Sequence, residues 1–131
     1  MENNHFTKWI PHENVDSIYD LETIGWRSEG FVLTLFPDHF DHNKRSECNL
    51  EMIWSKVLCY QVTEESYRPD WWKSTSDELW AFYISESSEF LKNFRKDNYL
   101  VPETVYHFVV LGTNFVMDIL SEEYPTIRFV K

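Results

Sequence analysis

Two groups of histidine and aspartate residues have side chains that catalysis or metal binding requires. The first, Asp38-His39-x-Asp41-His42, holds two imidazoles and two carboxylates, which are ligand types that zinc and other divalent metals use. Its spacing matches neither HExxH nor a zinc-finger pattern, and adjacent loop residues often point apart. We therefore expect no metal and no cofactor, and name His39 and His42 as the weak metal-ligand candidates.

The second group is His107 with Asp118, inside the longest apolar run of the chain, TVYHFVVLGTNFVMDIL at 104–120. If Gly112-Thr113 is a two-residue turn, Leu111 pairs with Asn114 and His107 lies directly opposite Asp118. A carboxylate beside an imidazole orients the ring, which acid–base catalysis and pH sensing both use. The alternative is a satisfied polar pair on a sheet, and a one-residue slip in register would separate the two side chains.

The sequence places no serine or cysteine as a nucleophile beside this pair. The GxSxG, P-loop and GxGxxG motifs are also absent. We therefore expect the run at 104–120 to be core alone, and we favour a non-catalytic protein over an enzyme.

Aromatic side chains beside carboxylates form the third group, at residues 67–80. Trp and Tyr dominate the energetics of protein interfaces, so this loop is the predicted partner- or ligand-binding site. Its members are Tyr67, Asp70, Trp71, Trp72 and Trp80. The alternative is that at least one of these tryptophans folds back over an open sheet face.

Charge narrows the class of partner. The chain of 131 residues has 22 acidic and 12 basic side chains and a formal charge of −10, which disfavours nucleic acid and anionic membranes and permits a basic protein partner. The length fits a single domain, 1–131, as a monomer or a homodimer. The two cysteines form no CxxC, and the first residues resemble no secretion signal, so we expect a cytoplasmic protein.

The elements that must position these groups are mostly strands. Alternating apolar residues predict strands at 21–27, 31–36, 50–54, 56–63, 79–84 and 126–130 and two more within 104–120, with Ser28-Glu29-Gly30 as a turn whose glycine takes a positive φ. One main helix is predicted near 87–96, and a short helical turn at 15–19. Short connections imply antiparallel pairing. The predicted fold is strand-dominated α+β, a curved antiparallel sheet of about 7–8 strands that is barrel-like or two-layered.

Three segments, IWSKVLCYQVTEES, LWAFYISESSEFLKNF and VYHFVVLGTNFVMDIL, are followed by Pro125-Thr126-Ile127. In this order they resemble small acidic proteins, classed as domains of unknown function, from Bacillus-type bacteria, over about residues 50–128. The shared motifs are structural, so no active residue carries over. Some proteins of this kind are encoded beside secreted toxins and act as their immunity partners, which supports the prediction only by analogy.

Two functions follow as expectations. The first is a protein-interaction domain, with an immunity-type inhibitor of a basic protein as its specific form. The alternative is a small-ligand-binding protein or enzyme whose pocket, inside the curved sheet, is lined by Trp80, Tyr106 and Phe108 and uses His107.

Overall fold

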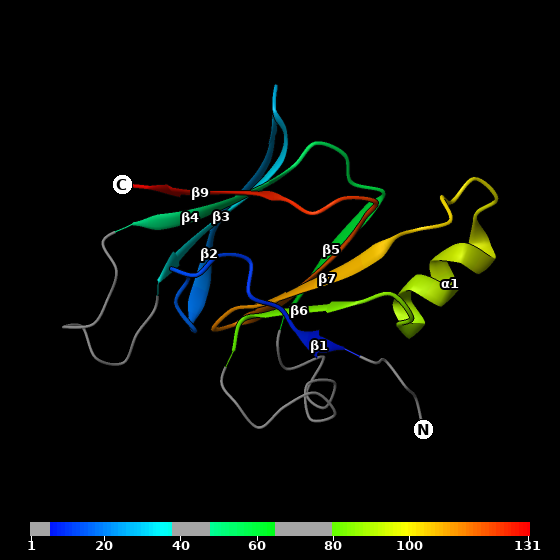
Figure 1. Cartoon of the computed structure of the whole chain (residues 1–131), viewed down its shortest axis with the longest axis horizontal. Coiled ribbons are helices and arrows are strands. Elements are labelled where there is room, and N and C mark those ends of the chain that lie inside the picture. Colours follow the sequence, from blue (N-terminus) through cyan, green and yellow to red (C-terminus); the bar gives the residue numbers. More distant parts are fainter. Residues whose placement is uncertain (1–5, 38–47, 65–79) are drawn as a thin grey trace.

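A computed structural model describes residues 6–37, 48–64 and 80–131 of the chain. That part of the chain contains nine strands and one helix (Figure 1). In order they are β1 (Thr7–Lys8), β2 (Tyr19–Arg27), β3 (Gly30–Pro37), β4 (Asn49–Trp54), β5 (Cys59–Glu64), β6 (Phe82–Ser85), α1 (Glu89–Asp97), β7 (Tyr106–Leu111), β8 (Phe115–Ser121) and β9 (Thr126–Val130).

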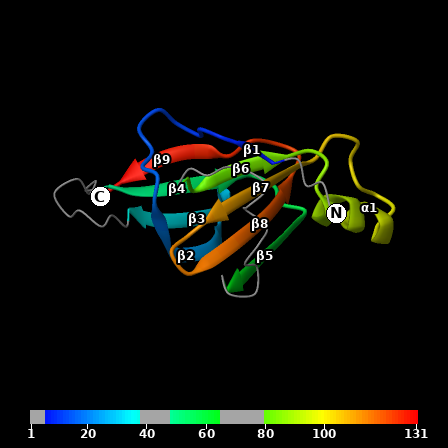
Figure 2. The ribbon, with the colours of Figure 1, turned by 90° about the horizontal axis from the view of Figure 1, so that it is seen from below.

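The strands form two sheets (Figure 2). The five-stranded sheet has the order β1-β6-β7-β8-β5, and the four-stranded sheet has the order β2-β3-β4-β9. All strand pairs are antiparallel, and neither sheet closes on itself. The predicted strand-dominated α+β fold is therefore confirmed in its two-layered form, without a closed barrel.

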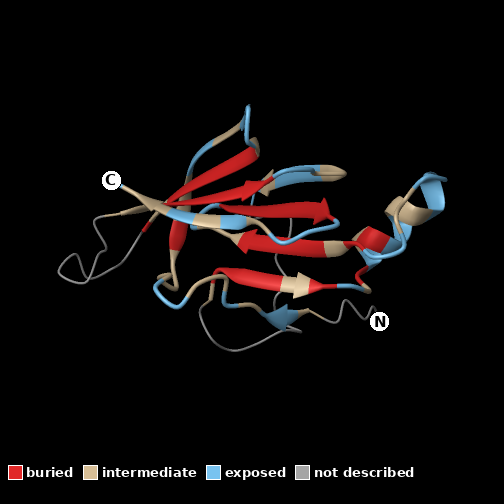
Figure 3. Cartoon of the chain, turned by 45° about the horizontal axis from the view of Figure 1, so that its top comes forward, coloured by how far each residue is buried: buried red, intermediate tan, exposed pale blue. Residues whose placement is uncertain are grey.

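The main core lies between the two sheets and explains the alternation in the sequence. In β3, Phe31, Leu33 and Leu35 are fully buried, and they pack with side chains from both sheets. Figure 3 shows the buried residues following the central strands of both layers. These facing side chains include Leu50, Met52, Trp54, Phe82, Phe108, Val110, Met117 and Ile119.

Helix α1 covers one end of the other face of the five-stranded sheet (Figure 1). Its inward stripe brings Leu91 against Val105 and Leu120. The helix begins after Ser88, whose hydroxyl oxygen accepts a hydrogen bond from the backbone N–H of Leu91 at 3.1 Å. The predicted helix is confirmed, and its first turn is fixed to the sheet.

The β7–β8 hairpin differs from the predicted register. Asp118 lies opposite Val109, not His107, because the turn consists of Thr113 and Asn114 and starts one residue later than expected. The cause is Gly112: a Cβ there would lie 1.6 Å from the ring of Phe115, so this glycine makes room for the ring instead of forming the turn. A turn displaced by one residue shifts the pairing by two, which leaves His107 and Asp118 on the same face.

The N-terminal segment also differs from the prediction. Residues 15–19 contain no helical turn, because Tyr19 begins β2 and the backbone N–H groups of Val15 and Asp16 donate to His12 O and to the Tyr19 hydroxyl. Strand β1 was not predicted, since two residues are too short to show alternation.

Gly30 has the predicted positive φ, 132°, at the β2–β3 turn. A Cβ there would lie 2.2 Å from the carbonyl oxygen of Trp54, so we expect Gly30→Ala to lower the free energy of unfolding by about 1–3 kcal/mol in urea titrations. Gly25→Ala is the matched control, because its Cβ would meet nothing within 4 Å and should change stability by less than about 0.5 kcal/mol. Equal losses in the two variants would contradict this explanation.

Candidate functional site

A row of polar side chains crosses the five-stranded sheet on the face that α1 partly covers. The strand pairing places Ser85 of β6 opposite His107 of β7, and Gln61 of β5 opposite Asp118 of β8. Ser88, at the start of α1, joins the row from above the sheet. Ser88, His107 and Asp118 are each at most 1% exposed. Five residues that are distant in sequence therefore form one largely buried polar group.

The hydrogen bonds form a continuous chain through this row. Ser88 Oγ lies 2.6 Å from His107 Nδ1, and His107 Nε2 lies 2.7 Å from Asp118 Oδ1. The side-chain amide of Gln61 donates to the other oxygen of Asp118 at 3.2 Å. We refer to Ser88, His107, Asp118 and Gln61 as the relay, in which the first three side chains are buried and Gln61 is the exposed end.

One arrangement of protons satisfies these four side chains. Because the N–H of Leu91 donates to Ser88 Oγ, the serine hydroxyl proton is available for His107 Nδ1. The ring proton then sits on Nε2 and is donated to the carboxylate of Asp118. This neutral tautomer leaves no donor or acceptor of the imidazole unpaired, as a buried polar group requires.

The order serine–histidine–aspartate is that of a hydrolase triad, but the surroundings differ. Ser88 is fully buried and already caps α1, and the rings of Phe6 and Phe90 each lie 5.0 Å from the imidazole. A nucleophile must reach a substrate carbon, which this serine cannot do in this arrangement. The geometry therefore gives the relay a structural role, in which it ties the first turn of α1 to β7, β8 and β5.

Asp118 also influences Cys59 on β5. Burial raises the pKa of the Cys59 thiol, and the negative charge of Asp118 raises it further. Since the thiolate is the reactive form of cysteine, Cys59 is a poor nucleophile at neutral pH.

Three aromatic rings connect the edges of the two sheets. Trp26 of β2 lies 5.1 Å from Phe31 of β3, and Phe31 lies 4.7 Å from Tyr60 of β5, measured between ring centroids. Phe31 is fully buried, whereas Trp26 is 60% exposed, Tyr60 42% and Val62 of β5 43%. We call Trp26, Phe31, Tyr60 and Val62 the aromatic edge. A buried anchor flanked by exposed Trp and Tyr is the composition of an interface hot spot.

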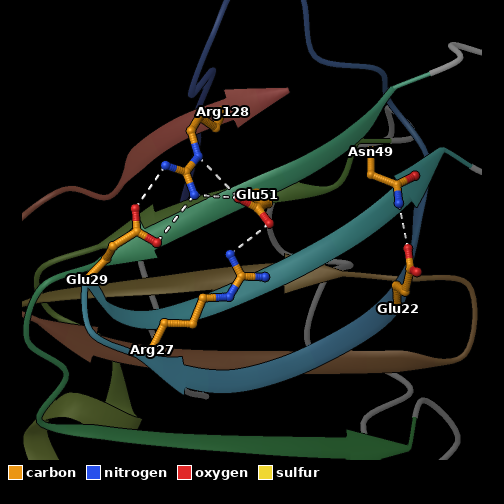
Figure 4. Close-up of polar contacts among 6 residues, drawn as sticks. All are labelled: Glu22, Arg27, Glu29, Asn49, Glu51 and Arg128. Atoms are coloured by element: carbon orange, nitrogen blue, oxygen red, sulfur yellow. Dashed lines mark hydrogen bonds and ion pairs between the residues drawn. The ribbon is translucent and has the colours of Figure 1, made fainter. Parts of the chain in front are cut away.

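Acidic residues also lie on β2 and β5, with Glu64 on the face of Tyr60 and Val62 and with Asp20 and Glu22 on the outer face of the four-stranded sheet. Asp20 and Glu22 lie on β2, and Glu64 ends β5. Asp20 accepts a hydrogen bond from the backbone N–H of Leu21, and Glu22 accepts one from the side-chain amide of Asn49 (Figure 4).

The outer face of the four-stranded sheet carries an ion-pair network (Figure 4). Arg128 of β9 forms two hydrogen bonds with Glu29, of 2.8 and 3.3 Å, and also contacts Glu51 of β4 at 2.9 Å. Arg27 of β2 contacts the other oxygen of Glu51 at 3.0 Å. Because the Glu51 side chain is only 8% exposed, it needs these two guanidinium groups.

This network predicts a pH dependence of stability. Burial acts to raise the pKa of Glu51, but hydrogen bonds from Arg128 and Arg27 outweigh it and hold the pKa below the ordinary value of 4.5. A carboxyl with a lowered folded-state pKa stabilises the fold above pH 4.5, and this contribution is lost as the pH falls through the lowered value. In urea titrations, wild type should exceed Glu51→Gln in stability at pH 7, with the difference shrinking below pH 4.5. A difference independent of pH would contradict this.

Of the predicted aromatic site, only Trp80 lies within the described residues, whereas the predicted pair of His107 and Asp118 is brought together in the relay. Trp80 donates its indole N–H to Trp9 O at 2.8 Å, and Lys8 Nζ lies 4.6 Å from the centre of the Trp80 ring. Trp80 is therefore a packing residue beside β1 and β6. The other candidates, Tyr67, Asp70, Trp71, Trp72, His39 and His42, lie outside the described residues.

The pocket expected around Trp80, Tyr106 and Phe108 is occupied by packing. Phe108 is fully buried, and its ring lies 6.0 Å from that of Tyr106. A small pocket of about 170 Å³ lies instead at the end of the four-stranded sheet, between Glu29 and Glu123. It is smaller than the roughly 300–1,000 Å³ of typical small-molecule sites.

Two features are absent from the described ranges of the chain. No helix there is long and apolar enough to cross a membrane. No group of three or more His, Cys, Asp or Glu side chains in those ranges could hold a metal ion.

Sequence reasoning missed six of the eight residues that make up the relay and the aromatic edge. Ser88 and Gln61 were overlooked in the relay, although Ser88 had the signal of a helix N-cap. All four residues of the aromatic edge were overlooked, because alternation along a strand does not show that the strand lies at the edge of its sheet. Compared with known proteins, the chain matches no family model, no curated protein and no solved structure.

Proposed function

We propose that this chain is a non-catalytic protein-interaction domain that binds a basic protein through the aromatic edge. The observation that carries the proposal is the exposure of Trp26 and Tyr60 on either side of the fully buried Phe31. Rigid aromatic side chains on strands lose little conformational entropy on binding and offer a large apolar contact area.

Charge supports the basic character of the partner. The formal charge of −10 speeds encounter with a cationic protein, and Glu64 places part of it on the face of β5 that carries Tyr60. The specific form that we propose is an immunity-type inhibitor, which covers the surface of a basic toxin. The alternative of a ligand-binding protein or enzyme gains no support from His107, which is enclosed within the relay.

The test is capture of a partner by the tagged chain from an extract of its native host. We expect a basic protein to be retained at low salt and released as the salt rises to about 0.5 M, because screening weakens contacts between exposed charges. Recovery of no partner, or of a partner whose binding is independent of salt, would contradict the proposal.

A further inference from the structure

Strand β5 is an open edge of the five-stranded sheet. In the part of the chain that the structure describes, the two sheets have four edge strands, β1 and β5 in one and β2 and β9 in the other. Within the described residues, β5 pairs with β8 along all six of its residues and with no strand on its other side. An edge strand presents unpaired backbone N–H and C=O groups along that side, which a further strand can use.

The other three edges carry features that discourage pairing. β1 is only two residues long, and β2 has an irregular register between Leu21 and Thr23. β9 begins after Pro125 and carries Arg128. Short length, bulges, charges and proline are the devices by which proteins protect their edges.

β5 has none of these devices in its interior. Its sequence, CYQVTE, contains no lysine, arginine, proline or glycine, and its register with β8 runs without interruption. Its only charge is Glu64 at the last position. Tyr60 and Val62 expose about two-fifths of their surface on the side that faces the other sheet, so an added strand would find apolar neighbours.

We propose that β5 accepts an extended segment of a basic partner as an additional strand of the five-stranded sheet. This inference rests on the proposed function and adds the manner of binding to it. The backbone of the segment would pair with β5, and every second side chain would lie beside Tyr60 and Val62 of the aromatic edge. The partner segment is basic because the chain has a formal charge of −10 and Glu64 lies on the same face of β5 as Tyr60 and Val62.

A second copy of the chain is the competing occupant of this edge. Two copies would bring together two molecules of charge −10, and Glu64 of each would approach the same short strand. Repulsion between like charges opposes that pairing, whereas a cationic segment gains from the same field. The charge therefore favours a basic partner over self-association.

The test uses a synthetic peptide of about ten residues in which lysine alternates with valine or phenylalanine, a length that covers one strand. Its matched control is the same peptide with every backbone amide N-methylated, which keeps the charge and the side chains and removes the pairing N–H groups. We expect the unmodified peptide to bind at least about tenfold more tightly. We also expect it to slow hydrogen exchange of the outward-facing amides within residues 59–64 of the full chain.

Four results would overturn the inference. These are equal binding of the two peptides, binding of neither, protection of all amides in 59–64 in the free protein, and a concentration-dependent dimer that protects the same amides. Equal binding would leave the proposed function intact, since a basic partner would then bind through side chains alone. Failure of the proposed function itself shows separately, as the absence of a salt-sensitive basic partner in the capture experiment.

Discussion

Replacing His107 with phenylalanine is expected to lower the free energy of unfolding by about 3–5 kcal/mol. The substitution fills similar space but removes both ring nitrogens, which contact Ser88 and Asp118 at 2.6 and 2.7 Å. The carboxylate of Asp118, which is 0% exposed, then loses its histidine donor in a site that water does not reach. Urea denaturation at pH 7 measures the loss, with circular dichroism to check that the variant folds.

A double-mutant cycle separates the relay from general damage to the core. Asp118→Leu alone should also destabilise strongly, whereas the combined variant should be more stable than the sum of the two losses predicts. We expect a coupling of at least about 1 kcal/mol, because the second substitution removes the group that the first leaves unpaired. Additive losses would mean that the two side chains act independently.

Thr34→Val is the matched control for this prediction. Thr34 is also a buried polar residue on a strand, but its hydroxyl oxygen has no hydrogen-bond partner among the described residues. Removing an unsatisfied hydroxyl while keeping the branched shape should leave stability unchanged or raise it by about 1 kcal/mol. Comparing His107→Phe with Thr34→Val tests whether the loss of stability depends on hydrogen-bond partners and not on burial alone.

Most of the fold was predictable because alternation and turn residues are local signals. Gly30 and Pro37 correctly marked the ends of β3, and the apolar stripe of Phe90, Leu91 and Phe94 marked α1. The β7–β8 register was not predictable in the same way. It depends on the ring of Phe115, which fills the space beside Gly112. The sequence preferences of turns do not include such side-chain packing.

The relay shows why only half of its residues could be predicted from the sequence. His107 and Asp118 are in one hairpin, so their shared face follows from strand periodicity even with the wrong register. Gln61 and Ser88 reach the same group through the β5–β8 pairing and the position of α1, which are tertiary relations. Sequence spacing could predict that His107 and Asp118 share a face, but not that Ser88 and Gln61 complete their hydrogen bonds.

The aromatic edge was missed for a related reason. Trp26 and Tyr60 both contact Phe31 from the inward faces of their strands, and inward aromatic residues are ordinarily core. Their exposure arises because β2 and β5 are the outermost strands of their sheets. Strand order across two sheets is needed to distinguish an exposed edge aromatic from a buried one.

Replacing Trp26 with alanine is expected to weaken binding of the captured basic partner at least about 30-fold, equivalent to about 2 kcal/mol. Trp26 is 60% exposed and packs edge-on against Phe31, so the variant should remain folded with only a small loss of stability. Tyr60→Ala should produce a loss of similar size. Titration calorimetry with the purified partner measures both affinities.

Tyr99→Ala is the control that separates the aromatic edge from exposed aromatic residues in general. Tyr99 follows α1 and is fully exposed, so it has more accessible surface than Trp26 but no buried ring beside it. Its loss should change affinity by less than about twofold, because hot spots require a packed and desolvated setting. If Tyr99→Ala weakened binding as much as Trp26→Ala, the partner would not bind specifically at the Trp26–Phe31–Tyr60 contact. The combined Trp26→Ala/Tyr60→Ala variant should lose less than the sum of its parts, since both rings act through contacts with the same Phe31.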